Sequence, residues 1–147
     1  MTIVERDAIC TLIPHSGAMC LIDAVERWDA DAILCSSSQH RSADNPLRVE
    51  GRLAPLHGIE FAAQAMAVHT GLVSGQSSKP RLGLLLSVRQ CIFHCERLDS
   101  IECPLEISAR RIAGNQEAVS YGFTIEAAGT VLVEGRLNVM LRQGGVT

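Results

Sequence analysis

The sequence predicts an α+β fold in which one long buried helix lies against a mostly antiparallel sheet. Two observations support this prediction. Residues 55–72 are apolar nearly all the way round a helix, which is typical of a buried helix. From residue 82 onward, apolar positions instead alternate with a period of two, as in strands with one buried face. A sheet wrapped around the helix is the economical way to cover both apolar surfaces.

Length and composition indicate one globular domain, expected to span residues 1–147. The hydrophobic share of 47% and the charged share of 20% are ordinary for such a protein. No apolar stretch approaches the roughly 20 residues of a membrane span. Glu5, Arg6 and Asp7 interrupt the region where a secretory signal has its apolar core. We therefore expect a cytoplasmic protein without a membrane segment.

Charge and aromatic content argue against a nucleic-acid partner. The formal net charge is −3, and aromatic residues make up only 3% of the chain, which leaves few platforms for stacking bases. The six cysteines include no CxxC pair, and most have apolar neighbours. We expect them to be reduced, mostly buried thiols.

The elements before the central helix follow from local signals. Residues 4–12 fit a short helix that ends before Pro14, because the residue before a proline avoids the helical conformation. Residues 32–37 fit a short strand. The polar segment 42–52, which contains Asn45-Pro46, fits a loop.

The central helix and the strands after it have clear boundaries. Pro55 suits a first helical position, and Gly71 and Gly75 signal the end of the helix. A Gly/Ser-rich loop then leads to a strand at 82–93. Three alternating segments follow, around residues 105–109, 119–125 and 131–141, separated by turns at Gly114-Asn115 and Ala128-Gly129. The chain is thus expected to hold one buried helix and about five strands.

Three polar side chains interrupt the apolar surface of the helix. His57, Glu60 and Gln64 fall within about 60° of one another at 100° per residue. A carboxylate on a buried helix is costly unless it is paired or functional. Glu60 is therefore either satisfied by an arginine or backbone donors, or it is an acid/base group in a cleft beside the helix start.

A second candidate feature is the loop that carries His15, between Pro14 and Ser16-Gly17. A histidine in a loop often lies at the surface or caps a turn. Its ordinary pKa also suits proton transfer near neutrality.

A zinc site built from the cysteine-rich segment is not expected. Cys91 and Cys95 share one face of the predicted strand, whereas His94 points away from both. The spacing of these residues and Cys103 fits no standard zinc pattern. We expect neither a metal nor a cofactor.

Two motifs resemble the β-hydroxyacyl-acyl-carrier-protein dehydratases. Residues 12–23 resemble their LPHR-x-P-x-LL-x-D opening, and residues 59–64 resemble their IEAMAQ helix. The order of the following elements also agrees, including Asp99 at a strand entrance, so the resemblance covers residues 12–141. It implies the hotdog fold, in which a sheet wraps a long central helix. It also implies a homodimer or higher homo-oligomer with active sites between subunits.

One position departs from that family. The dehydratases carry a catalytic histidine in an H-F-P-G loop fourteen residues before the helix glutamate, where this sequence has Pro46. The sequence looks closer to a divergent branch of predicted dehydratases linked with aryl polyene and polyketide-like pathways. That branch keeps a PH-x-G-x-M-x-L-x-D opening, an N-P loop and a GIE-x-x-AQ helix.

The resemblance implies a hydro-lyase that dehydrates 3-hydroxyacyl thioesters of acyl carrier protein or coenzyme A in fatty-acid or polyketide-type biosynthesis. His15 and Glu60 are the expected catalytic residues, with His57 as the second candidate for the histidine role. The Gly58 amide is expected to donate to the developing enolate oxygen. The expected substrate-binding residues are Asn45, His57, Gly58 and Gln64.

Two other functions remain open on the sequence alone. A hotdog acyl thioesterase also uses a carboxylate on the central helix, and a non-catalytic dehydratase-like subunit would explain the missing loop histidine. Four arginines are candidates for docking an acidic carrier protein: Arg48, Arg52, Arg81 and Arg89.

Overall fold

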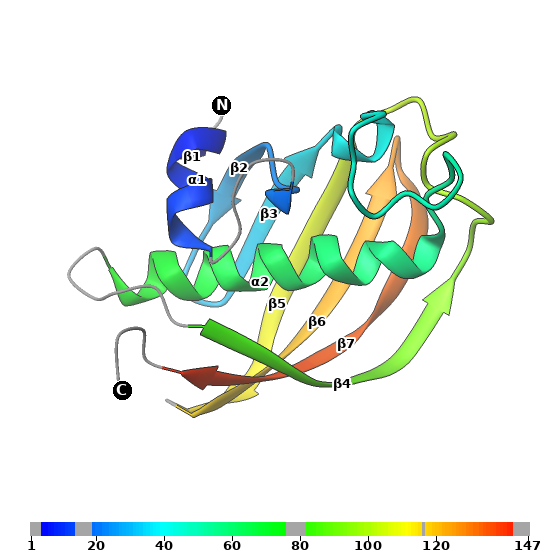
Figure 1. The fold of residues 1–147 in the computed structure, drawn as a ribbon. Coiled ribbons are helices and arrows are strands. Elements are labelled where there is room, and N and C mark those ends of the chain that lie inside the picture. Colours follow the sequence, from blue (N-terminus) through cyan, green and yellow to red (C-terminus); the bar gives the residue numbers. More distant parts are fainter. Residues whose placement is uncertain (1–3, 14–18, 76–81, 116, 143–147) are drawn as a thin grey trace.

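The computed structural model describes residues 4–13, 19–75, 82–115 and 117–142. In these residues a long helix, α2 (Gly58–Ser74), lies in the curve of an antiparallel sheet (Figure 1). The sheet comprises β1 (Val4–Glu5), β2 (Ala24–Trp28), β3 (Ala32–Ser37), β4 (Leu82–Phe93), β5 (Leu105–Gly114), β6 (Ala118–Ala127) and β7 (Thr130–Arg142). The strand order is β1-β2-β3-β5-β6-β7-β4. This arrangement is the hotdog fold, so the predicted fold class is confirmed.

The core lies between α2 and the inner face of the sheet. Every second residue is buried from Leu105 to Ala109 of β5 and along the whole of β6, as the period of two predicts. Phe61, Ala65 and Val68 of α2 are fully buried on this face, as are Ile107 and Ile125 of the strands. Burial of a large apolar side chain stabilises the fold by about 1.5–3 kcal/mol.

The boundaries predicted from the sequence agree with the structure for two of the strands and less well for the first elements. Strands 32–37 and 82–93 begin and end where predicted. The helix predicted at 4–12 begins only at Arg6 (α1, Arg6–Leu12), because Val4 and Glu5 pair with β2. β2 itself was not predicted. A register irregularity follows Val25, and Val25 is its one buried residue, so no alternation marks the strand.

The prediction that all six cysteines are reduced thiols is wrong for one pair. Cys10 on α1 and Cys20 form a disulfide. α1 packs against α2, where a Cβ on Gly71 would lie 3.4 Å from the Leu12 side chain. The backbone at Met19 and Leu21 is held to the same helix by hydrogen bonds, which brings the two cysteines together. Linear spacing contains no sign of this pairing.

β4 forms one edge of the sheet and is bent at Gln90. Gln90 has a positive φ of 53°, and the register with β7 shifts between Arg89 and Ile92. A Cβ on Gly135, opposite this bulge, would lie 3.1 Å from the Cys91 Cα, so the close approach requires glycine. The strand bends there towards the loops beside the start of α2 (Figure 1). None of the described helices is long and apolar enough to cross a membrane.

Candidate active site

The start of α2 is held by two loops that meet there. The Leu98 N–H donates to the Leu53 carbonyl over 2.7 Å, and the Leu53 N–H donates to the Asp99 carboxylate over 2.8 Å. The Arg97 guanidinium beside Asp99 holds the pKa of that carboxyl well below its usual range. A 3-10 turn, η3 (Pro55–His57), then leads directly into α2. The helix start therefore has a fixed position.

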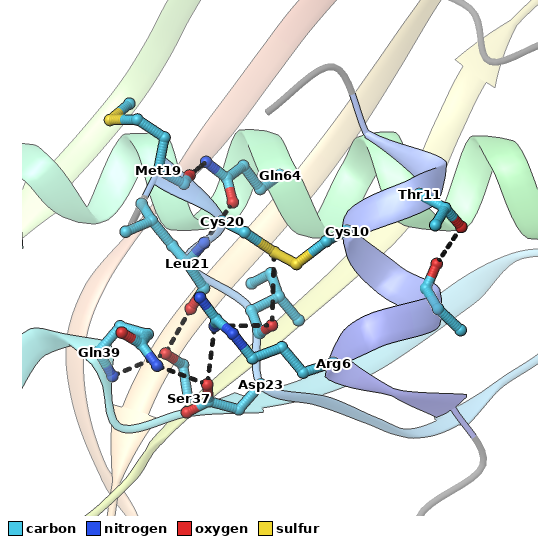
Figure 2. The surroundings of a disulfide bond; sticks show 12 residues. Arg6, Cys10, Thr11, Met19, Cys20, Leu21, Asp23, Ser37, Gln39 and Gln64 are labelled. Atoms are coloured by element: carbon cyan, nitrogen blue, oxygen red, sulfur yellow. Dashed lines mark hydrogen bonds and ion pairs between the residues drawn. A yellow bond between two sulfur atoms is a disulfide. The ribbon is translucent and has the colours of Figure 1, made fainter. Parts of the chain in front are cut away.

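Gln64 connects the two motifs that carry the dehydratase resemblance. Its side chain is 1% exposed. The Oε1 atom accepts the Leu21 N–H over 2.8 Å, and the Nε2 atom donates to the Met19 carbonyl over 2.7 Å (Figure 2). The same Nε2 atom donates to the Glu60 carboxylate over 3.3 Å. The polar stripe of α2 is thus bonded to the backbone that follows the His15 loop.

Asp23, the last residue of the first motif, fixes the other end of that backbone. It accepts hydrogen bonds from the side chains of Arg6 (3.0 Å) and Gln39 (2.7 Å) and from the Ser38 N–H (2.7 Å). Figure 2 shows these groups beside the Cys10–Cys20 disulfide. The aspartate therefore organises the segment rather than facing a substrate. The motif contains Asp23, but its pattern indicates no role for this residue.

Two predicted site residues at the helix start have local partners. The Ala54 N–H donates to Nδ1 of the half-buried His57 over 3.2 Å, so the neutral ring carries its proton on Nε2. The Gly58 N–H donates to the Pro55 carbonyl. A Cβ on Gly58 would lie 3.0 Å from the Ile125 side chain, which gives a packing reason for the glycine.

Asn45 and Arg48 are engaged within their own loop. Asn45 is 6% exposed, donates to the Gln39 carbonyl over 2.9 Å and accepts the Leu47 N–H over 2.9 Å. This second bond is a typical Asx turn. The Arg48 guanidinium donates to three backbone carbonyls of the loop, those of His40, Ser42 and Gly51. Arg52 and Arg89, by contrast, are exposed.

Of the predicted site residues, the structure brings Glu60 and Gln64 into contact. His15 and the candidate docking residue Arg81 lie outside the described residues. Within the described ranges, no group of three or more histidine, cysteine or acidic side chains is arranged to hold a metal ion.

The model of the ApeP-like family, described as ApeP dehydratase, matches residues 7–144. The chain belongs to the ApeP-like dehydratase family. Its function is accordingly dehydratase-like, and both motifs that suggested this lie inside the matched range. Among curated proteins, none matches the chain.

Solved structures agree with this assignment. The chain is similar to the dehydratase heterocomplex ApeI:P from Xenorhabdus doucetiae, with a TM-score of 0.80 and 26% identity over 92% of this chain and 91% of that chain. It also resembles the thioesterase HI1161 from Haemophilus influenzae, with a TM-score of 0.65 and 12% identity over 95% and 92% of the two chains. A mutant of the thioesterase PA1618 from Pseudomonas aeruginosa gives a TM-score of 0.58 and 16% identity over 82% and 81%. The two thioesterases share the hotdog fold.

Proposed function

We propose that this ApeP-like protein is a hydro-lyase that dehydrates 3-hydroxyacyl thioesters of an acyl carrier protein in fatty-acid, polyketide-type or aryl polyene biosynthesis. The family match supports the reaction class. The observation that carries the proposal is the contact between the two motifs, because Gln64 joins Glu60 to the backbone that follows the His15 loop. Acid/base catalysis requires that the two groups that exchange protons with the substrate are held at fixed positions around it.

The proposed reaction needs two proton transfers. A base removes the C2 proton, the electron pair forms the C2–C3 double bond, and an acid protonates the C3 hydroxyl as it leaves as water. We assign these roles to Glu60 and His15, with His57 as the alternative histidine. His57 presents a protonated Nε2, since Ala54 occupies its Nδ1. Gln64 positions Glu60. We assign Gly58 a packing role, because its N–H is bonded to the Pro55 carbonyl.

The assay that tests this proposal follows a 3-hydroxyacyl thioester in the presence of the purified protein. A hydro-lyase interconverts it with the enoyl thioester and leaves the thioester bond intact. A thioesterase would instead release a free acid and a thiol, which would contradict the proposal. His15→Ala and His57→Ala, compared in the same assay, choose between the two histidines. Unfolding curves of both variants separate a catalytic loss from a loss of stability.

The similarity to the ApeI:P heterocomplex favours a second candidate, a dehydratase-like subunit that acts only with a different partner. For the chain alone we propose at least a homodimer, because β4 leaves an edge whose backbone groups can pair with another copy. Light scattering on the purified protein measures this. Inactivity alone together with activity after addition of a second hotdog subunit would favour the heteromeric candidate.

Carrier-protein docking is proposed at exposed arginines, chiefly Arg52 in the loop before the helix start and Arg89 on β4. An acidic carrier is attracted electrostatically, so its affinity should fall as salt rises. Equal affinity at low and high ionic strength would argue against this docking mode.

We also propose a cytoplasmic location, although the Cys10–Cys20 disulfide of the structure is typical of oxidising compartments. Alkylation of free thiols at the moment of cell lysis, followed by mass spectrometry, measures the state of this pair. A pair found oxidised throughout would argue against the location.

A further inference from the structure

The Cys10–Cys20 disulfide encloses the stretch of chain that contains His15. The two cysteines are ten positions apart, and His15 lies midway between them in the sequence. The nearest described residues on either side of His15 are Ile13, directly after α1, and Met19. A cross-link restricts the chain that it encloses. The disulfide therefore restricts the stretch that carries a proposed catalytic residue.

The Met19 end of this stretch is held by hydrogen bonds that do not involve the disulfide. Gln64 of α2 bonds the Met19 carbonyl and the Leu21 N–H, on either side of Cys20. The Leu21 carbonyl also accepts a hydrogen bond from the Ser37 hydroxyl. These bonds remain available when the disulfide is reduced. This end therefore stays attached to α2 in both redox states.

The α1 end of the stretch depends more on the disulfide. α1 has seven residues, and helices shorter than about 12 residues are marginal in water without tertiary contacts. Apart from the disulfide, α1 is held by burial of Ile9 and Ile13 and by the ion pair between Arg6 and Asp23. That ion pair is 32% and 30% exposed on its two sides, so it contributes little. After reduction these contacts keep the protein folded, but α1 is held less firmly.

The two sulfur atoms differ in their access to a reductant. Cys10 is half-buried, whereas Cys20 is fully buried. A thiolate from solution therefore attacks the Cys10 sulfur, and Cys20 is the leaving group. The Cys20 Sγ atom lies 3.9 Å from the Ile22 carbonyl oxygen, to which the Arg6 guanidinium donates over 3.5 Å (Figure 2). A cation beside a departing thiolate stabilises it and favours the exchange.

Reduction proceeds by two thiol–disulfide exchanges with a dithiol. One thiolate of the dithiol attacks the Cys10 sulfur, which breaks the Cys10–Cys20 bond, forms a mixed disulfide at Cys10 and leaves Cys20 as a thiolate that takes up a proton. The second thiolate of the dithiol attacks the reductant's own sulfur in the mixed disulfide. This step closes the disulfide of the reductant and releases Cys10, which also takes up a proton. Two electrons and two protons pass to the protein, and the dithiol is oxidised.

The other four cysteines are poor or separable competitors for this exchange. Burial raises the pKa of Cys35 to about 12, and burial also raises the pKa of Cys91 and that of Cys95. The thiolate is the reactive form, so these three thiols react slowly. Cys103 is exposed, and its substitution by serine removes its reactivity.

We propose that Cys10 and Cys20 form a reversible redox site that controls catalysis by fixing or releasing α1 at one end of the stretch that contains His15. The effect on catalysis rests on the proposed function, whereas the effect on α1 does not. The oxidised protein is the more active form, because both ends of the stretch are then fixed. A reversible pair also agrees with the proposed cytoplasmic location, since disulfides of cytosolic proteins are usually transient, catalytic or redox-sensing.

Hydrogen exchange tests the effect on α1 without reference to activity. The full chain with Cys103→Ser is compared in its oxidised form and after reduction with dithiothreitol, and NMR follows each backbone amide. Reduction should speed exchange of the α1 amides at least about tenfold, whereas exchange of the Leu21 amide should change less than about twofold. Cys10→Ser with Cys20→Ser should resemble the reduced protein and should not respond to dithiothreitol. Equal exchange of α1 in both states would overturn the proposal, as would a pair that excess dithiothreitol cannot reduce in the folded protein.

Kinetics on the same preparations, after removal of the reductant, test the effect on catalysis. Reduction should lower kcat for dehydration of a 3-hydroxyacyl thioester at least about tenfold with a smaller change in KM. Reoxidation with glutathione disulfide should restore kcat. Faster exchange of α1 with kcat unchanged or raised would overturn the control of catalysis. Inactivity in both redox states would contradict the proposed function, and hydrogen exchange would still decide whether the pair controls α1.

Discussion

Two buried polar side chains on α2, five residues apart, illustrate different uses of the same helix. Gln64 and His69 are each 1% exposed. Gln64 bonds the backbone of a distant motif and the Glu60 carboxylate. His69 bonds the Tyr121 hydroxyl through Nδ1 and the Asp29 carbonyl through Nε2. Both side chains are satisfied, so hydrogen bonding alone does not distinguish them.

The difference lies in what each network reaches. The Gln64 network ends at a half-buried carboxylate beside the helix start and at the segment after the His15 loop. The His69 network ends at a backbone carbonyl and at a tyrosine inside the core. A buried polar residue is thus a better functional candidate when its partners include a titratable group that substrate can approach. On this basis, changes near Glu60 should affect catalysis, and changes at His69 should affect stability.

The largest effect is expected for Glu60→Gln. If Glu60 transfers a proton in the rate-limiting step, dehydration of a 3-hydroxyacyl thioester should slow by about 10²–10⁴-fold. The amide oxygen can still accept the hydrogen bond from Gln64, so the free energy of unfolding should change little. Kinetics and urea unfolding of the same preparation measure both quantities. Full activity in this variant would remove Glu60 from the mechanism.

Gln64→Leu should reduce both activity and stability. It leaves the Leu21 N–H and the Met19 carbonyl without their partner, at a cost of about 1–3 kcal/mol for each buried group. Misplacement of the segment by about 1 Å should lower kcat roughly 10²-fold with a smaller change in KM. Gln64→Glu keeps an acceptor for Leu21 but loses the donor to both Met19 and Glu60, and its carboxylate repels that of Glu60, so kcat should fall in this variant too. Loss of stability with unchanged kcat would make Gln64 purely structural.

His69→Phe should lower stability and leave activity intact. The Tyr121 hydroxyl loses its bond to Nδ1 and keeps the one with Thr70, and the exposed Asp29 carbonyl loses its bond to Nε2, at a cost of about 1–3 kcal/mol for the buried hydroxyl. Adding Tyr121→Phe removes this hydroxyl as well, so the double variant should recover part of the loss. The measurement is a double-mutant cycle of unfolding free energies, with kcat measured on each folded protein. A large fall in kcat for His69→Phe would show that the His69 network also contributes to catalysis.

Much of this arrangement could be predicted from the sequence. The buried helix and the strands from β4 to β7 have strong periodicity, because one or both faces pack against the core. Glu60 and Gln64 stood out as polar interruptions of an apolar helix, and their contact follows from a spacing of four residues. The contact with Met19 and Leu21 could not be found in this way, because it joins positions more than 40 residues apart.

Other features depend on tertiary contacts that leave no local pattern. The Cys10–Cys20 disulfide forms because α1 folds back on α2, which spacing does not reveal. Asn45 and Gly58 were predicted to bind substrate; within the structure Asn45 forms an Asx turn and Gly58 packs closely against Ile125. The same residue types serve turns, packing and ligands, so sequence alone does not decide among these uses.

The smallest effect is expected in the pH dependence of stability. Burial lowers the pKa of His69, and burial likewise lowers the pKa of His40. The unfolded chain therefore binds more protons than the folded one when the pH falls below about 6.5, the ordinary histidine value. The stabilising contribution of neutral His69 is present above that pH and is lost as the pH falls towards its lowered folded pKa. Its contribution to the slope cannot exceed about 1.4 kcal/mol per pH unit.

Unfolding free energies of the wild type and His69→Phe between pH 7.5 and pH 5 test this expectation. The wild type should lose stability on acidification, and His69→Phe should lose less over the same range because its position no longer titrates. His40→Phe should also reduce the loss of stability on acidification. His40 donates to the Ile101 carbonyl and does not belong to the Tyr121 network, so it is an independent test. Equal slopes in the wild type and both variants would show that neither buried histidine is held neutral by the fold.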